Sequence, residues 1–440
     1  MIKDIVAEIY PLDRTLVSEG LDRSLEVLGR RMPPGSSYRI EEFPAGKDYW
    51  TWTAPKRYSV REAYLEVVGG GRVVDFKDDP LHLVSYSVPV DAVLSWEELA
   101  GHLHYSAKRP AAVPWVFKYY DAAWGFCLSK DAYDRLPRDK KYRAVIRSEF
   151  ADGPGLKVGV GLVHPEGGPN PEAGEILVSA HICHPRQAND NASAVGVGAA
   201  VAAGLAARPL PRGSASVRFL FQPETVGSVC YLASHEELIG RTRAAVILES
   251  IGNRNTLAVQ RSWQGATHID RVSAAVLDRK APDHRSLPAW AMFSADEKVI
   301  NGPGVGVPSV MFTRYPYEEY HTTDDDMDVI HEDMLQEAAD VVEETVRIAA
   351  SDYVPARLFK GPVHLSKHGL WADYRQDREA SLAVQKAMLY FEGRHTVFDI
   401  AEALGMDYWA MRGIVESYRA KGLVEALPVP ARPQDPAHFL

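Results

Sequence analysis

The chain contains few cysteines, no excess of positive charge and no long uninterrupted apolar run. Its 440 residues include three scattered cysteines, Cys127, Cys183 and Cys230. An odd and scattered set of this kind excludes a disulfide-built scaffold and favours a reducing compartment, so we predict a cytoplasmic protein. No apolar run approaches the roughly 20 residues that a membrane span requires. The opening MIKDIVAEIYPLDR is interrupted by charges and lacks the apolar core of a signal peptide.

The charge balance is acidic, with a net charge of -10 at neutral pH. A chain of this charge has no general attraction to nucleic acid or to anionic membranes, so we expect neither as a partner. The composition leaves a homo-oligomer open. The length favours two or three domains over a single core.

Three regions of the chain differ in pattern. Residues 1–45 and 150–370 combine helical spacing with strand–turn–helix units, and we predict that together they form one α/β domain. Between them, residues 46–149 contain short β-like segments separated by Gly, Pro and Asp, which predicts an inserted β-rich domain. Residues 375–440 contain three short helical patterns followed by a glycine-turned strand pair, the outline of a winged helix.

The predicted winged helix lacks the charge that DNA binding requires. From 375 to 440 there are 8 Lys and Arg residues against 9 Asp and Glu residues. The electrostatic footprint of a nucleic-acid-binding module is therefore missing. We predict a packing or oligomerisation module instead.

The second part of the α/β domain contains a series of candidates for buried strands. Each is a short apolar run followed by a turn and a helical segment, and the first such helix, AVGVGAAVAAGLAA, consists of small residues. Apolar strands that alternate with helices predict an α/β sheet with both faces covered by helices. The runs are EILVSA (175–180), VRFLFQ (217–222), AAVILES (244–250) and PSVMFTRY (308–315).

Side chains that can bind a metal stand where these strands end. Because sites in an open α/β sheet form outside the carboxyl ends of its strands, residues spread over 140 positions can converge there. Two histidines with carboxylates suit Zn²⁺, and a further glutamate can take a proton from the water that the metal activates. The residues are His181, Glu224, Glu249 and His321 after the strands, and Asp190 at the start of the first helix.

In order and context these residues resemble the co-catalytic zinc aminopeptidases and their carboxypeptidase relatives. Five motifs over about 150–345 carry the resemblance: His181 after its strand, Asp190-Asn191, PETVGS, ESIG and YHTTDD. The resemblance implies a zinc-peptidase-type mixed sheet. It also implies the site roles: metal ligands His181, Asp190, Glu249 and His321, with Asp190 bridging, and Glu224 as general base.

A second resemblance covers nearly the whole chain. Bacterial aminopeptidase-like proteins associated with polysaccharide biosynthesis share the CHP…NDN motif, YSVPV and WGFC in the β insertion, and a C-terminal winged helix. This resemblance implies the architecture more than the substrate.

Thr225 departs from the aminopeptidase pattern. Where that family has a Glu-Glu pair, this chain has Glu224-Thr225, so the base is kept and a carboxylate ligand of one ion is lost. Because a hydroxyl is a poor zinc ligand, the resemblance implies one tightly held zinc ion and leaves the second ion open. An alternative register aligns Pro223 with the base and Glu224 with the ligand, which leaves the site without a base.

Cys183 is a second departure, because the family has an acidic residue two positions after the first histidine. A thiol at this place either packs in its neutral form or ligates the metal. We interpret His184 as a turn or pocket residue rather than a ligand. A Cys183–His184 nucleophilic pair is disfavoured, since adjacent side chains of an extended chain point to opposite sides.

Residues near the last motif are candidates for substrate binding. Arg314 and Tyr317 shortly precede His321 and are predicted to hold a substrate carboxylate or to stabilise the tetrahedral oxyanion. A structural ion pair is the alternative for Arg314. Asp296 and Glu297 either lie near the pocket or belong to a solvated turn.

The functional prediction is a zinc-dependent aminopeptidase that removes an N-terminal amino acid from a peptide or an aminoacylated small molecule. Two alternatives stay open. One is a deacylase or amidohydrolase of a biosynthetic intermediate. The other is a metal-binding regulatory protein that has lost catalysis, which the loss of a carboxylate at Thr225 favours.

Overall fold

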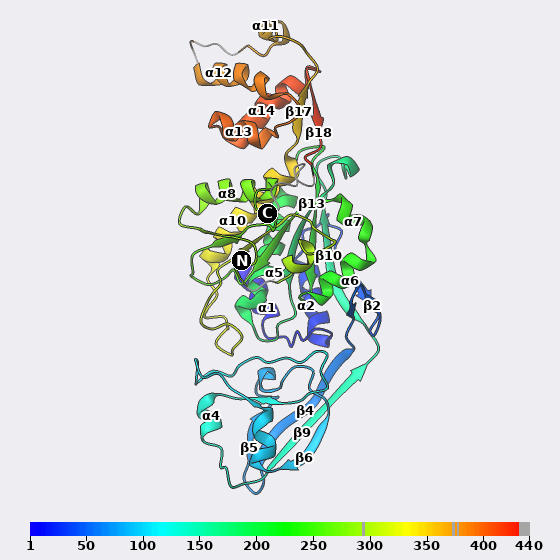
Figure 1. Cartoon of the computed structure of the whole chain (residues 1–440), viewed down its shortest axis with the longest axis vertical. Helices are drawn as coiled ribbons and strands as arrows, with labels where there is room; N and C mark the ends of the chain where they lie inside the picture. Colours follow the sequence, from blue (N-terminus) through cyan, green and yellow to red (C-terminus); the bar gives the residue numbers. More distant parts are fainter. Residues whose placement is uncertain (293–294, 372–374, 376–377, 431–440) are drawn as a thin grey trace.

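The computed structural model describes residues 1–292, 295–371, 375 and 378–430. A central α/β region lies between a β-rich region at one end of the molecule and a group of C-terminal helices at the other (Figure 1). The site predicted from the sequence falls in the central region.

Within the described residues the central sheet has eight strands and is mixed. The four strands in its middle run parallel to one another, whereas the strand on either side of them runs antiparallel. The predicted mixed sheet is therefore confirmed. In spatial order the strands are β1 (Arg39–Phe43), β10 (Leu156–Val163), β12 (Ser216–Gln222), β11 (Glu175–His181), β13 (Thr242–Glu249), β16 (Ser309–Thr313), β14 (Ala258–Gln260) and β15 (Arg285–Leu287).

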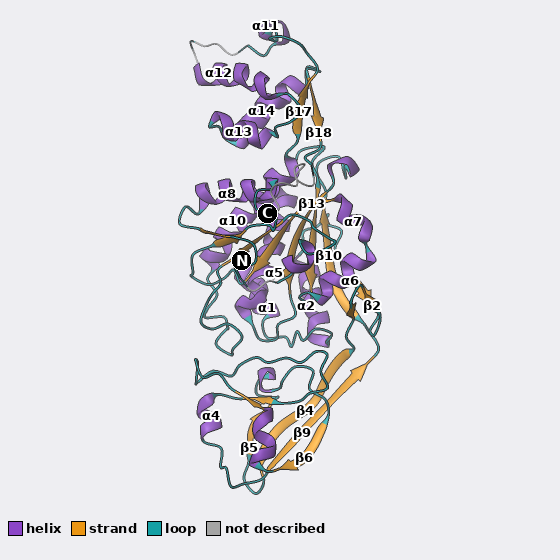
Figure 2. Ribbon diagram, in the orientation of Figure 1, coloured by secondary structure: helices purple, strands orange, loops and turns teal. Residues whose placement is uncertain are grey.

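Helices cover both faces of this sheet, as predicted (Figures 1 and 2). On one face α5 (Ala194–Ala207) packs against α1 (Ile2–Ile9) and α10 (Glu332–Ser351), and α8 (His268–Lys280) packs against α10. On the other face lie α6 (Val226–Ser234) and α7 (Glu236–Arg241). The remaining helices of this region are α2 (Glu19–Arg31) and α9 (Glu297–Ile300).

The small residues of α5 let it approach the sheet and α1 closely. A Cβ atom at Gly198 would lie 3.0 Å from the ring of Phe221, and one at Gly196 would lie 3.0 Å from Ile2. The segment Ala188–Ala207 is long and apolar enough to cross a membrane by length and composition, but most of it is buried inside the protein. Its apolar character is thus accounted for by packing in the core.

The β-rich region contains a second sheet with its own apolar core. The core includes Leu65, Phe126 and Tyr142. Its antiparallel strands are, in spatial order, β5 (Arg72–Asp75), β4 (Arg57–Val67), β9 (Tyr142–Ala151) and β6 (Val90–Leu94). Short elements complete the region: β2 (Asp48–Tyr49), β3 (Trp52–Thr53), α3 (Trp96–Leu99), β7 (Leu103–His104), β8 (Phe126–Cys127) and α4 (Lys130–Asp134). The domain boundaries given above stay predictions.

The C-terminal region differs from its prediction at the strand pair. Gly422, at φ 66°, ends the preceding helix, because Leu423 N–H donates to the Tyr418 carbonyl, and it does not turn a hairpin. In the described residues after that helix, the strand β18 (Val424–Leu427) pairs with β17 (Val354–Arg357), which precedes the helices. The winged helix stays a prediction, and parts of 375–440 lie outside the described residues. The helices are α11 (Leu365–His368), α12 (Arg378–Ala387), α13 (Val397–Leu404) and α14 (Tyr408–Arg419).

Candidate metal centre

The four residues singled out as ligands lie together at the carboxyl end of the parallel strands. His181 is the last residue of β11 and Glu249 the last of β13. Asp190 lies in the irregular segment before α5, and His321 lies in the loop after β16. His321 lies against Asp190, and His181, Glu249 and Asp190 line a pocket of about 220 Å³. Its lining is His181, His184, Asp190, Glu224, Glu249, Met292, Ala295, Tyr315 and Tyr320.

Asp190 is the centre of this group. Its Oδ1 lies 3.4 Å from His181 Nε2, and its Oδ2 lies 2.9 Å from His321 Nε2. His181 Nε2 also lies 2.9 Å from Glu249 Oε2. Asp190 therefore faces two histidines, one with each carboxylate oxygen, as a carboxylate that bridges two cations would.

The electrostatics of the group are those of buried charges in close contact. Burial opposes ionisation of Asp190, but the surrounding histidines outweigh it and hold its pKa below the ordinary value. Burial raises the pKa of Glu249, since the nearby His181 offsets only part of the desolvation. Burial lowers the pKa of His184 well below its ordinary value, so this ring is neutral near pH 7.

These side chains fit a metal ion. In the described part of the chain, Asp190 Oδ1 is buried without a hydrogen-bond partner, which is unusual for a polar atom inside a protein. Within the same residues, three groups have ligand atoms within 4.8 Å of one another. They are His181–Asp190–Glu249, His184–Asp190–His321 and His181–Cys183–His184. Nitrogen and carboxylate donors of this kind suit zinc.

Asp325 holds the backbone around Asp190 through hydrogen bonds. This buried carboxylate accepts the N–H groups of Asn189 at 2.6 Å and Asp190 at 3.0 Å. Asn191 then ties the segment to β13, because its side chain donates to Leu248 O and accepts from Ser250 N–H. Asp190 is thus fixed relative to Glu249 before any ion binds.

Glu224 stands at the edge of the pocket, in the turn between β12 and α6. Its Oε2 lies 3.6 Å from His184 Nε2, and its side chain is 28% exposed. Burial raises the pKa of Glu224 above its ordinary value. None of the three groups of candidate ligands found in the described residues includes Glu224.

Asp296 holds the turn that carries Glu224. The buried Asp296 carboxylate accepts the N–H of Thr225 at 2.9 Å, the hydroxyl of Ser228 at 2.6 Å and the amide of Gln222 at 2.9 Å. Of the two interpretations given for Asp296, the structure favours a place beside the site over a solvated turn.

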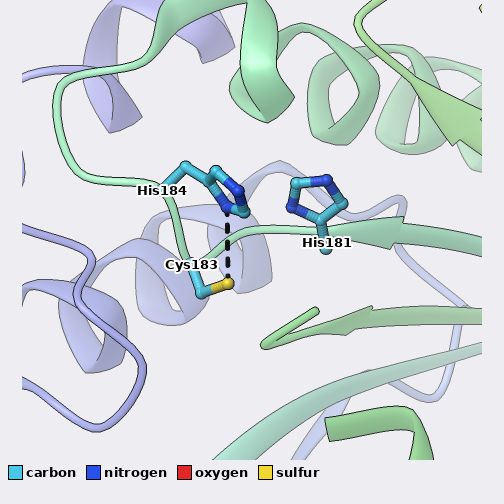
Figure 3. Close-up of side chains that lie close together, drawn as sticks. All are labelled: His181, Cys183 and His184. Carbon is cyan, nitrogen blue, oxygen red and sulfur yellow. Dashed lines mark hydrogen bonds between the residues drawn. The ribbon is translucent and has the colours of Figure 1, made fainter. Parts of the chain in front are cut away.

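Cys183 and His184 do contact each other. The chain leaves the sheet after His181, so the alternation of an extended strand does not apply, and Cys183 Sγ lies 3.5 Å from His184 Nδ1 (Figure 3). Burial raises the pKa of the Cys183 thiol, which disfavours a thiolate nucleophile. The imidazole of His184 lies in the pocket, one of the two places expected for it.

Arg314 and Tyr317 do not line this pocket. Arg314 is buried, donates to the carbonyls of Ile251 and Asn255, and pairs with Glu337, so the structure favours its structural alternative. Tyr317 donates its hydroxyl to Asp325 over 2.6 Å. It therefore supports the backbone of Asp190 through Asp325.

The sequence predicts no site role for two aromatic residues that lie beside the histidines. Trp115 comes from the β-rich region, and its ring lies 4.3 Å from that of His184 and 4.7 Å from that of His321. Tyr320 stacks on His321 at 3.8 Å. The density of aromatic residues around Trp115 is a signal for aromatic packing, but it does not reveal which ring reaches the site.

Comparisons with known proteins identify the family and the fold of this chain. A family profile described as "Domain of unknown function (DUF4910)" matches residues 3–352. A Clostridium acetobutylicum protein, named as a candidate polysaccharide biosynthesis protein with an aminopeptidase-like domain, is 27% identical over 416 residues, which is 92% of each chain. The predicted resemblance to such proteins is confirmed.

Solved structures show the same fold. A crystal structure of a candidate peptidase from Clostridium acetobutylicum superposes with a TM-score of 0.82 at 26% identity, covering 97% of this chain and 96% of the other. A zinc aminopeptidase from Bacillus subtilis superposes with a TM-score of 0.60 at 17% identity, covering 80% of this chain and 97% of the other. At 17% identity, the similarity to the Bacillus subtilis enzyme shows a shared fold and nothing further.

Proposed function

The chain belongs to the family described as "Domain of unknown function (DUF4910)", and from its site we propose that it is a metal-dependent hydrolase of the aminopeptidase type. The observation that supports this most directly is the position of Asp190, with one carboxylate oxygen toward His181 and the other toward His321. His181, Asp190, Glu249 and His321 would hold the metal, and zinc fits their nitrogen and oxygen donors.

The chemistry follows from the residues around this centre. A bound ion would supply a Lewis acid that polarises an amide carbonyl and activates water. Glu224 would take the proton of the attacking water at its carboxylate and pass it to the leaving amine. Its raised pKa suits this role, because a base whose pKa lies closer to neutral pH holds and releases a proton more readily.

The shape of the pocket favours a small end group as the part that enters it. Its space of about 220 Å³ lies below the ~300–1,000 Å³ that is typical of ligand pockets. Tyr315, Tyr320 and Met292 form its walls. An N-terminal amino acid of a peptide or of an aminoacylated small molecule suits such a space better than an extended chain.

The name of the Clostridium acetobutylicum relative points to an alternative substrate. A deacylase or amidohydrolase of a saccharide intermediate would use the same metal and the same base. A substrate panel separates the two functions, because an aminopeptidase requires a free amino group. We expect hydrolysis of free aminoacyl amides and little hydrolysis of their N-acetyl counterparts; the reverse preference would favour the deacylase.

Glu224→Gln tests the mechanism. We expect kcat to fall at least ~100-fold while the bound metal, measured by elemental analysis, is unchanged. Glu166→Gln is the matched control, since Glu166 is exposed in the loop after β10. A Glu224→Gln variant with unchanged kcat would exclude Glu224 as the base. A metal-loaded wild type that hydrolyses no amide in the panel would favour the regulatory alternative.

A further inference from the structure

The ring of His184 lies in the pocket beside Asp190 and His321. Its Nε2 is 3.8 Å from Asp190 Oδ2, and one ligand atom from each of the three residues lies within 4.8 Å of the others. His184 is buried, and the rings of Trp115 and His181 lie 4.3 and 4.4 Å from it. Its position is therefore fixed by packing on two sides.

We propose that His184 is a metal ligand that replaces the carboxylate missing at Thr225, so that the centre binds two ions. This inference rests on the proposed function, because it concerns a second ion in the same centre. The first ion would be held by His181, Asp190 Oδ1 and Glu249, and the second by Asp190 Oδ2, His321 and His184.

Thr225 itself is engaged elsewhere. It is buried at the start of α6, at φ 61°, and its N–H donates to Asp296. Its side chain offers a neutral hydroxyl, which is a poor ligand for zinc. A second ion would thus need another donor, and the buried His184 imidazole offers one, because its Nε2 lies 3.8 Å from Asp190 Oδ2.

Cys183 orients the ring of His184. Its sulfur lies 3.5 Å from His184 Nδ1 and accepts the backbone N–H of Glu224 over 3.1 Å (Figure 3). When Nδ1–H donates to the sulfur, Nε2 carries the free electron pair, and Nε2 is the nitrogen that faces Asp190. Histidine ligands in proteins are commonly oriented through their second nitrogen in this way. Here Cys183 would do so where the related enzymes keep a carboxylate.

A competing arrangement would bind the second ion through Cys183 directly. Cys183, His181 and His184 also form a compact group. This arrangement would include neither Asp190 nor Glu249, so the ion would have no carboxylate ligand from the centre. It would also leave His321 as a neighbour of Asp190 without a metal role, so the geometry favours the arrangement through Asp190.

Metal titration of the full-length chain tests the inference. The protein is stripped with a chelator and titrated with Zn²⁺ in competition with a chromophoric chelator. We expect two ions per chain with unequal affinities, and one ion in His184→Ala, with the second bound more than ~100-fold more weakly. His184→Glu, which restores a carboxylate, is expected to regain the second ion. His364→Ala, at an exposed histidine, is the control and should bind two.

Cobalt spectra separate the two arrangements. We expect the Co²⁺-loaded wild type to lack a sulfur-to-cobalt charge-transfer band; its presence would overturn the inference in favour of Cys183 as a ligand. A His184→Ala variant that still binds two ions would also overturn it. A wild type that binds one ion overturns this inference and leaves the proposed function standing, whereas a wild type that binds no ion overturns both.

Discussion

The backbone N–H of Glu224 donates a hydrogen bond to the sulfur of Cys183, over a distance of 3.1 Å. This bond joins the turn between β12 and α6 to the segment that follows β11. The candidate base and the candidate ligand His184 are therefore linked through Cys183, whose sulfur also lies 3.5 Å from His184 Nδ1. Changes in residues that only position these groups should alter activity without removing any group that reacts.

Asp296→Asn tests whether Asp296 holds the turn that carries the candidate base, Glu224. The Asp296 carboxylate accepts three hydrogen bonds, from Thr225, Ser228 and Gln222. The side-chain amide of an asparagine would place its NH₂ group, itself a donor, against at least one of these donors, and that hydrogen bond would be lost. We expect a loss of about 1–3 kcal/mol in unfolding free energy and a lower kcat, with metal content unchanged. Urea unfolding and steady-state kinetics measure the two effects.

Asp139→Asn is the control for this change, because Asp139 is 78% exposed. It should leave both quantities as in the wild type. If Asp296→Asn unfolds like the wild type and keeps its kcat, Asp296 does not position the turn.

Tyr317→Phe separates two roles of Tyr317. The sequence predicts a substrate-binding residue, whereas the hydroxyl donates to Asp325, which in turn holds the N–H of Asp190. If the hydroxyl positions Asp190, its loss should weaken metal binding about tenfold and leave KM unchanged. Losses of this size are typical when a residue that orients a metal ligand is changed. A raised KM with unchanged metal affinity would support the substrate-binding role. Tyr105→Phe, at an exposed tyrosine, is the control.

Metal removal should lower the melting temperature. Asp190 Oδ1 is buried and lacks a hydrogen-bond partner in the described structure, and a cation would satisfy it. Binding at 100 times Kd stabilises the folded state by about 2.7 kcal/mol. We expect calorimetry to show a drop of several degrees on chelation and recovery with Zn²⁺. The same melting temperature with and without Zn²⁺ would argue against a metal at this place.

Much of the sheet and the convergence of the ligands could be predicted because both depend on local pattern. The buried strands β11, β12, β13 and β16 are short apolar runs, and their carboxyl ends necessarily meet at one edge. The helix α5 coincides with the run of small residues predicted as a helix. These features need no knowledge of distant contacts.

The position of His184 could not be predicted, because a distant residue fixes it. The buried guanidinium of Arg14 donates to the carbonyls of Ile182, His184 and Gln187, which shapes the segment after β11. Trp115 reaches the same ring from the β-rich region. Both contacts join segments far apart in the chain, and no periodicity in the sequence reports them. The strand pair β17–β18 was missed for the same reason.

Glu297 should make the stability of the metal-free protein depend on pH. Burial raises the pKa of Glu297 to about 8, and in the described structure its Oε2 has no hydrogen-bond partner. Between its ordinary pKa of 4.5 and about 8, unfolding releases a proton, so stability is highest below this range and falls as pH rises through it. One proton contributes up to ~1.4 kcal/mol per pH unit. In urea unfolding with chelator present, Glu297→Gln should flatten this slope from pH 5 to 8 and exceed the wild type in stability at pH 8, whereas Glu166→Gln should follow the wild type. A Glu297→Gln variant with the wild-type slope would show that another group carries the pH dependence.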